Sequence, residues 1–280
     1  MTLLQTIAEA EPRVIATVSL LALVFAGSSV VWNGLLHRWL NNRLLLEHHC
    51  EPRARWHGPA GLAAVYLALL FAGMSLSARI PRQPVQEAPA PGLESILIFA
   101  GTALGIVVVV PPILVASGQS WAALGMSSSA MSDQVRVGVV GYFAAVIPMA
   151  FSMLITLPLR GGENQHSLLK LLMASPTWTT ILAVAISAVI AAPLLEELLY
   201  RVILQGWLTT FLPATIAIPL VAGLFCLVHG WRDGLALLPL AFILGYVFHR
   251  RHSYISVVVI HALFNATMLT LQLLNPQAHS

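Results

Sequence analysis

Long apolar stretches separated by short polar segments dominate the pattern of this 280-residue chain. A helix of about 20 apolar residues crosses the hydrocarbon core of a bilayer, and the chain offers eight candidate stretches. The predicted spans cover residues 14–36, 61–78, 93–117, 136–158, 178–195, 213–229, 234–248 and 254–274. The pattern therefore predicts an all-α fold, a polytopic membrane helix bundle of about eight transmembrane helices.

The ends of two stretches refine this prediction. The first is preceded by "EAEPR" rather than by a basic segment, and no small-residue cleavage site follows it, so we expect it to remain as a helix. The fifth contains Pro193, but "EELLYRVILQGWL" continues with strong helix formers to Trp207. We expect this proline to kink a long helix rather than to end it.

The connecting segments suggest an orientation. Residues 37–58 form the densest basic loop, which contains Arg38, Arg43, Arg53 and Arg55. The positive-inside rule places such a loop in the cytoplasm, so that with eight spans both termini face outward. Residues 79–92 are proline-rich and are expected to be an extended linker. The chain shows no internal repeat and no soluble domain, so its function is expected in the membrane part.

Composition agrees with a membrane location. Hydrophobic residues make up 58% of the chain and charged residues only 9%, whereas a soluble domain carries about 25% charged residues. The basic residues are scattered through loops, which argues against a nucleic-acid partner. Cys50 and Cys226 lie far apart and are expected to be free thiols. The many alanines and arginines beside a single lysine, Lys170, suggest a bacterial inner-membrane protein.

Two adjacent carboxylates, Glu196 and Glu197, lie inside an apolar region that continues on both sides. An acidic residue at membrane depth costs on the order of 2.5–3.5 kcal/mol on insertion scales, so it normally has a partner or a wet cavity. Arg201 follows Glu197 by four residues, which places the two side chains on one helical face. Glu196 is rotated by about 100° from its neighbour and is left without that partner.

Three more polar side chains are predicted at similar depth. His229 ends the sixth span, while His261 and Asn265 lie four residues apart on one face of the eighth. Together with Glu196, this set suits water chemistry. A buried carboxylate can act as a general base, one imidazole can hold the water, and the second imidazole with the amide can donate to a developing oxyanion.

Each of these features also has a structural interpretation. The Glu197 and Arg201 pair can serve only as a helix clamp, and a histidine at the end of a span can cap carbonyl groups. His261 with Asn265 can provide interhelical hydrogen bonds, a common use of such side chains in membranes. Because four costly polar features coincide within residues 196–265 of an otherwise apolar sequence, we favour a functional site.

Three short motifs carry a resemblance to a known family. "EELLYR" at 196–201, "FCLVH" at 225–229 and "HALFN" at 261–265 resemble the EExxxR, FxxxH and HxxxN signatures of the CPBP intramembrane proteases. This family includes the eukaryotic type II CAAX prenyl endopeptidase and bacterial bacteriocin-processing and self-immunity proteins. The resemblance covers about residues 178–275. It implies a protease core at residues 131–280, preceded by N-terminal transmembrane helices and polar loops at 1–130 without a family motif.

The resemblance implies a role for each motif residue. Glu196 would activate a water molecule, His229 would help to hold it, and His261 with Asn265 would stabilise the tetrahedral oxyanion. Glu197 with Arg201 would brace the helix, and Phe225 would pack. The implied activity is that of an intramembrane endopeptidase that cuts membrane-associated or lipidated proteins or peptides in the lipid bilayer.

The metal requirement is open at this stage. Glu196, His229 and His261 are the candidate ligands if zinc is bound. The chain lacks an HExxH motif, in which two histidines one turn apart flank the base, and Asn265 is a better oxyanion donor than zinc ligand. We therefore expect no cofactor, with a zinc-dependent protease as the alternative. The histidines in residues 47–50 and 249–252 are interpreted as interfacial residues rather than ligands.

Two other classes of protein remain as alternatives. A non-catalytic self-immunity or partner-binding membrane protein would keep the motifs without cutting a substrate. A small transporter would use Glu196 in a proton relay, but such proteins commonly show repeated halves, which this sequence lacks.

Overall fold

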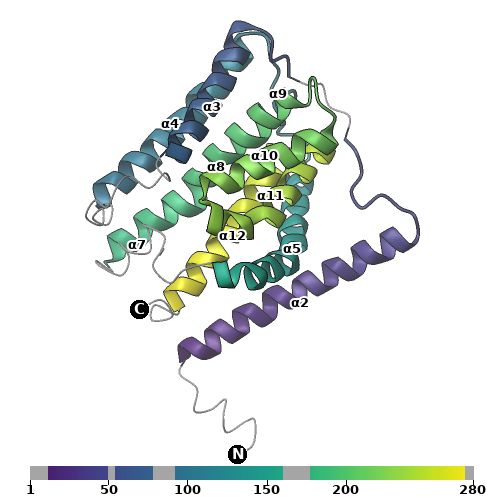
Figure 1. Cartoon of the computed structure of the whole chain (residues 1–280), viewed down its shortest axis with the longest axis vertical. Helices are drawn as coiled ribbons and strands as arrows, with labels where there is room; N and C mark the ends of the chain where they lie inside the picture. The colour runs from purple at the N-terminus through teal and green to yellow at the C-terminus, as the bar shows by residue number, and fades with distance from the viewer. Residues whose placement is uncertain (1–11, 50–53, 78–91, 160–176, 275–280) are drawn as a thin grey trace, which may run out of the picture.

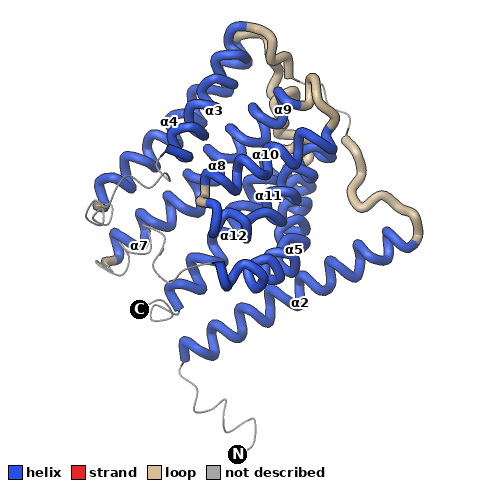
Figure 2. The backbone as a smooth tube through the Cα atoms, viewed as in Figure 1, coloured by secondary structure: helices blue, strands red, loops and turns tan. Residues whose placement is uncertain are grey.

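The computed structural model describes residues 12–49, 54–77, 92–159 and 177–274. These residues form helices joined by loops, and no strand occurs among them (Figure 2). The predicted all-α class is therefore confirmed. Cys50, Arg53 and residues 79–91 of the predicted linker lie outside the described residues.

Eight helical stretches are found where eight spans were predicted. They are α2 (Pro12–Leu40), α3 (Pro59–Ser77), α4 (Leu93–Ala116), α5 (Met131–Thr156) with a short 3₁₀ turn η1 (Leu157–Leu159), a broken helix over Trp178–Leu208, α10 (Ala214–Val228), α11 (Trp231–Arg251) and α12 (Tyr254–Leu274). Within the described ranges, seven are long and apolar enough to cross a membrane, and α10 is apolar but has only 15 residues. The protein is a multi-pass membrane protein.

Several helices extend further than the hydropathy pattern predicted. The first continues to Leu40, so that Arg38 lies in its last turn rather than in a loop. The seventh ends in a basic turn of His249, Arg250 and Arg251. Basic side chains are favourable at a helix C-terminus and lie outside the hydrocarbon core, so a count of apolar residues misses these turns.

The broken helix runs through Pro193, as predicted. Its segments are α7 (Trp178–Ala185), the π-helix η2 (Ile186–Ala191), α8 (Ala192–Glu197), the π-helix η3 (Leu198–Gln205) and α9 (Gly206–Leu208). The two π-helical segments flank the glutamate pair. Such wide turns are rare in helices and occur frequently at functional sites.

The helices form a bundle around the broken helix (Figure 1). α2 packs on one side against α5, while α3 and α4 pack on the other side against the broken helix. α10, α11 and α12 lie between these outer helices, with α12 in contact with both α5 and the broken helix. The C-terminal helices therefore occupy the interior, and the N-terminal helices cover them.

Two prolines inside helices, Pro148 and Pro239, leave carbonyl groups that side chains of neighbouring helices satisfy. Pro148 cannot donate to the carbonyl of Ala144, and Trp32 Nε1 of α2 donates to that oxygen at 3.2 Å. Pro239 of α11 likewise frees the carbonyl of residue 235, which accepts from Ser152 Oγ of α5 at 3.3 Å. In a bilayer no water is available for such groups, so these side chains specify how the helices pair.

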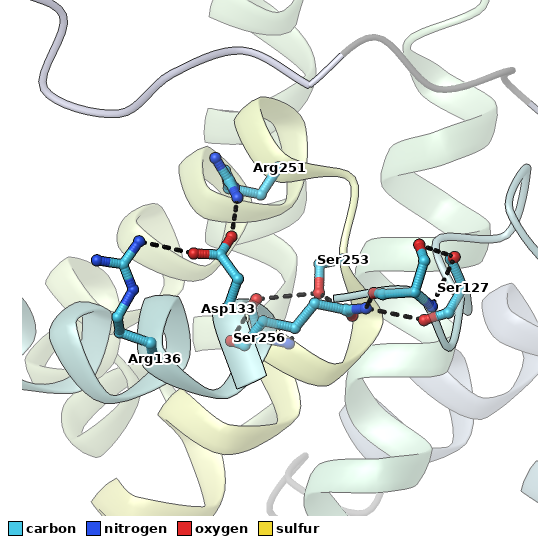
Figure 3. A network of polar contacts seen from close by, with 8 residues as sticks. Ser127, Asp133, Arg136, Arg251, Ser253 and Ser256 are labelled. Carbon is cyan, nitrogen blue, oxygen red and sulfur yellow. Dashed lines mark hydrogen bonds and ion pairs between the residues drawn. The ribbon is translucent and has the colours of Figure 1, made fainter. Parts of the chain in front are cut away.

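A polar network joins the starts of α5 and α12 to the C-terminal end of α11 (Figure 3). Asp133, in the first turn of α5, accepts from Arg136 at 2.7 Å and from Arg251 at the end of α11. Ser253, just before α12, donates to Gln134 Oε1 at 2.7 Å. These contacts fix the start of α5 against the α11–α12 junction and hence the position of α12.

Two glycines let α5 approach α12 closely. A Cβ at Gly138 would lie 2.6 Å from Val259 Cβ and 2.9 Å from the backbone oxygen of Ser256. A Cβ at Gly141 would lie 2.5 Å from the Cδ1 atom of Ile260. Small residues at helix contacts are the usual means of close packing in membranes. The face of α12 opposite the broken helix is held in this way.

We predict that Gly138→Ala lowers the thermal unfolding midpoint of the purified protein in detergent. The added methyl group overpacks the contact and costs about 1–3 kcal/mol. Gly105→Ala in α4 is the matched control, because nothing lies within 4 Å of its added Cβ. This control should leave the midpoint unchanged or raise it slightly, and equal effects of the two substitutions would contradict the packing described.

Candidate active site

Glu196, His229 and His261 meet beside the broken helix, which is in contact with both α10 and α12. Glu196 and Glu197 are the last two residues of α8, immediately before the second π-helical segment. His229 is the C-cap residue of α10, and His261 lies in the middle of α12. Residues far apart in sequence are thus brought to one place inside the bundle.

Glu196 faces both histidines. Its Oε2 atom lies 3.7 Å from His229 Nε2 and 3.9 Å from His261 Nε2. Both distances exceed a direct hydrogen bond and suit one bridged by a small polar molecule. The side chains of Glu196 and His229 are 15% and 25% exposed, whereas His261 is 5% exposed. The site is therefore reachable from the side of Glu196 and His229.

The local backbone fixes His229. Its Nδ1 atom lies 2.7 Å from the carbonyl oxygen of Phe225, which can only accept, so Nδ1 is the donor and Nε2 is directed to Glu196. Gly230 follows with φ 95°, a conformation that L side chains rarely adopt. At Gly234 a Cβ would lie 1.8 Å from the backbone oxygen of Cys226. The two glycines let the chain turn into α11 directly after the histidine.

Glu197 is fully buried and joins two helices. Its Oε2 accepts from Arg201 Nε at 3.1 Å, which is the pair expected from the spacing, and its Oε1 accepts from His261 Nδ1 at 2.8 Å. Neither Glu197 nor Arg201 is exposed. A buried charge is tolerated only when it is paired and hydrogen-bonded. The carboxylate also sets the tautomer of His261, because a neutral imidazole that donates from Nδ1 presents an unprotonated Nε2.

Phe225 lies at the centre of this group. Its ring centroid is 4.4 Å from that of His229, 5.8 Å from that of His261 and 5.4 Å from that of Tyr200. Arg201 Cζ lies 5.1 Å from the same centroid. Phe225 therefore packs as expected, and it also gives the buried guanidinium an aromatic face, a contact worth about 0.5–2 kcal/mol.

One face of α12 supports the broken helix at three points. Tyr254 Oη donates to the carbonyl of Leu194 at 2.6 Å, and His261 donates to Glu197. Asn265 Nδ2 donates to the carbonyl of Ala188 in η2 at 2.8 Å. The amide thus binds the helix backbone, and no hydrogen bond between Asn265 and the other motif side chains is found among the described residues.

Several buried polar atoms beside the site have no hydrogen-bond partner among the described residues. They are Glu196 Oε2, Tyr200 Oη and the Nη1 and Nη2 atoms of Arg201. Such atoms are uncommon in proteins, because each costs about 1–3 kcal/mol when left unpaired. These atoms are concentrated within two turns of one helix, from Glu196 to Arg201.

Sequence reasoning identified the three converging groups Glu196, His229 and His261 but missed some of their partners. The spacing of residues along the chain predicts neither the hydrogen bond from His261 to Glu197 nor the contacts of Tyr200 and Tyr254. These partners lie on other helices, and only the packing brings them together. The run of strong helix formers that continues after Pro193 to Trp207 indicated that the two glutamates lie within a helix.

The described residues contain no group of three or more His, Cys, Asp or Glu side chains placed to hold a metal ion. Four other histidines, His48, His49, His249 and His252, line a cavity of about 220 Å³ beside α9. Cys226 is a buried free thiol.

The fold and the site define a polytopic membrane protein with a carboxylate–imidazole cluster inside its helix bundle. Residues 177–267 match the family model described as type II CAAX prenyl endopeptidase Rce1-like. This segment contains all three motifs, so the resemblance stated from them is confirmed over this part of the chain. It supports a CAAX-type intramembrane endopeptidase in general. No curated protein and no solved structure matches the chain. The division at residue 130 stays a prediction.

We predict that the two glutamates differ in their contribution to stability. Glu197→Gln leaves Arg201 buried without a counter-charge, which costs about 3–5 kcal/mol, and should lower the unfolding midpoint and the yield of folded protein. Glu196→Gln is the matched control, since Glu196 is partly exposed and its Oε2 has no hydrogen-bond partner among the described residues. A Glu197→Gln protein as stable as the control would contradict the bridging role of this carboxylate.

Proposed function

We propose that the protein is an intramembrane endopeptidase in which Glu196 activates water for attack on a peptide bond. The observation that carries the proposal is the convergence of Glu196 Oε2 with the Nε2 atoms of His229 and His261 at 3.7 and 3.9 Å. No structural role accounts for Glu196, because Arg201 is paired with Glu197. The match of residues 177–267 supports the same class of enzyme.

Glu196 and His229 are suited to hold the attacking water. Because Nδ1 of His229 donates to Phe225, its Nε2 accepts one hydrogen bond from the water in the neutral imidazole. The carboxylate accepts the other and takes that proton as the hydroxide attacks the carbonyl carbon. Glu196 then gives the proton to the leaving amine when the carbon–nitrogen bond breaks. Proton transfers of this kind contribute about 10²–10⁴ in rate.

His261 is suited to stabilise the oxyanion. In its charged form Nδ1 still donates to Glu197, and Nε2 carries a second proton on the side of Glu196. The carboxylate of Glu197 favours this imidazolium. A donor held in advance toward the developing oxyanion is worth about 10²–10³ in turnover. Glu197 therefore acts in catalysis through His261, in addition to bracing Arg201.

The substrate class follows from the location of the site. Glu196 lies inside a helix of 31 residues that is long enough to cross a membrane, so the scissile bond must reach membrane depth. Peptides that are membrane-associated or lipidated can do so without a large solvation cost. A prenylated C-terminal peptide is the form suggested by the name of the matching family.

A zinc-dependent version of the protease would use Glu196, His229 and His261 as ligands, with Glu197 behind His261 as its hydrogen-bond acceptor. We propose the metal-free version, because the described donors are not grouped to hold an ion. If no peptide is cut, the protein is instead a non-catalytic immunity protein or a transporter.

We predict that Glu196→Gln reduces cleavage by at least about 10²-fold with little change in thermal stability, because shape is kept while the base is lost. The assay uses protein in lipid nanodiscs with internally quenched peptides, one farnesylated with a CAAX terminus, one unprenylated and one an apolar membrane peptide. Glu94→Gln, at the exposed start of α4, is the control and should keep the wild-type rate. Near-normal turnover of Glu196→Gln would remove Glu196 as the base.

We predict that cleavage persists in excess chelator and that purified protein contains much less than one zinc per chain. In this mechanism the carboxylate of Glu196 acts as the base, and the imidazolium of His261 stabilises the oxyanion. No Lewis acid is therefore needed. Rates before and after dialysis against chelator, together with elemental analysis, provide the measurement. Stoichiometric zinc, with activity lost on chelation and regained on adding zinc back, would establish the zinc-dependent version instead.

A further inference from the structure

The π-helical segment before Glu196 has a definite hydrogen-bond register. The backbone N–H of Ala192 donates to the carbonyl of Ser187, five residues earlier. In the same register the next donor is residue 193 and its acceptor is the carbonyl of Ala188. Residue 193 is proline, which has no N–H. The sequence of the broken helix thus leaves the Ala188 carbonyl without its backbone partner.

Asn265 occupies the place of this missing donor. Its Nδ2 atom donates to the Ala188 oxygen at 2.8 Å, a length typical of a good amide–carbonyl hydrogen bond. The carbonyl lies inside a membrane helix, where an unsatisfied group is costly because water does not replace the bond. An asparagine on a neighbouring helix is therefore a physical substitute for the lost N–H.

At two other prolines of the bundle, a side chain of a neighbouring helix also replaces the missing N–H donor. The carbonyls freed by Pro148 and Pro239 accept from Trp32 and Ser152 on neighbouring helices. These two pairs join α2 to α5 and α5 to α11, and none of these helices carries Glu196, His229 or His261. The third pair differs in its position, because Pro193 precedes the proposed base Glu196 by three residues, less than one helical turn.

We propose that Asn265 is a positioning residue that replaces the N–H missing at Pro193 and thereby fixes the segment that carries Glu196. This inference rests on the proposed function and changes one part of it. The resemblance implied an oxyanion donor, whereas here Asn265 acts on the base through the helix backbone. Without the bond, η2 can shift its register, and Glu196 moves relative to His229 and His261.

The experiment is a double-mutant cycle between positions 193 and 265. Asn265→Ala should lower kcat by roughly tenfold to a hundredfold with little change in KM, as expected for a misplaced base. Pro193→Ala restores a backbone N–H. In the Pro193→Ala background, Asn265→Ala should therefore lower kcat by no more than about threefold, because the Ala188 carbonyl now has a donor within its own helix.

Pro148→Ala is the matched control for this rescue. It restores an N–H in α5, where Trp32 serves the freed carbonyl, and should leave the full loss caused by Asn265→Ala. An asparagine that donates directly to the oxyanion would lose about 10²–10³ both in the wild-type background and in the Pro193→Ala background. Additive effects of the two substitutions at 193 and 265 would therefore overturn the proposal.

Hydrogen–deuterium exchange of the segment 186–197 tests the same cycle without a substrate. Asn265→Ala should speed exchange in this segment, and the Pro193→Ala double variant should return it to the level of Pro193→Ala alone. If no peptide is cleaved, the proposed protease function fails while this measurement still decides the pairing of Asn265 with Pro193. Exchange that is unaffected by Asn265→Ala would overturn the positioning role.

Discussion

The rest of the site depends on the two hydrogen bonds that the fully buried carboxylate of Glu197 accepts. It accepts from Arg201 within its own helix and from His261 on α12, so that one anion pairs with a guanidinium and orients an imidazole. The desolvation cost of such charges is several kcal/mol each and is offset only by well-formed pairing. Removing any member leaves another buried without a partner. The broken helix and α12 are thereby held at one relative position.

The second constraint is the absence of water around the backbone. In a bilayer each carbonyl that a proline frees must find another donor, and Trp32, Ser152 and Asn265 provide three such donors from neighbouring helices. Each hydrogen bond requires one particular pair of helices at one particular height. Prolines that weaken individual helices therefore make the packing between helices more specific.

The helices were predictable because hydropathy and length decide them, whereas their ends were not, since charged turns beyond the hydrocarbon core carry no apolar signal. The pairing of Glu197 with Arg201 followed from a spacing of four residues. The approach of His229 and His261 to Glu196 was expected from the cost of polar side chains at membrane depth, and the resemblance pointed to the same residues. The bond from Asn265 to Ala188 was beyond prediction, because it requires the π-helical register, which no residue pattern in the segment 186–191 reveals.

The two adjacent glutamates acquire different chemistry from their surroundings. Glu197 has lost all contact with solvent and accepts hydrogen bonds from Arg201 and His261, so its charge holds these two side chains in place. Glu196 remains 15% exposed beside two imidazoles, each of which has its Nδ1 atom engaged, one with the Phe225 carbonyl and the other with Glu197. Both rings therefore present Nε2 to the same carboxylate oxygen. A carboxylate without a hydrogen-bonded counter-charge, facing two nitrogens that can each accept or donate a proton, supports the proposal that Glu196 is the base.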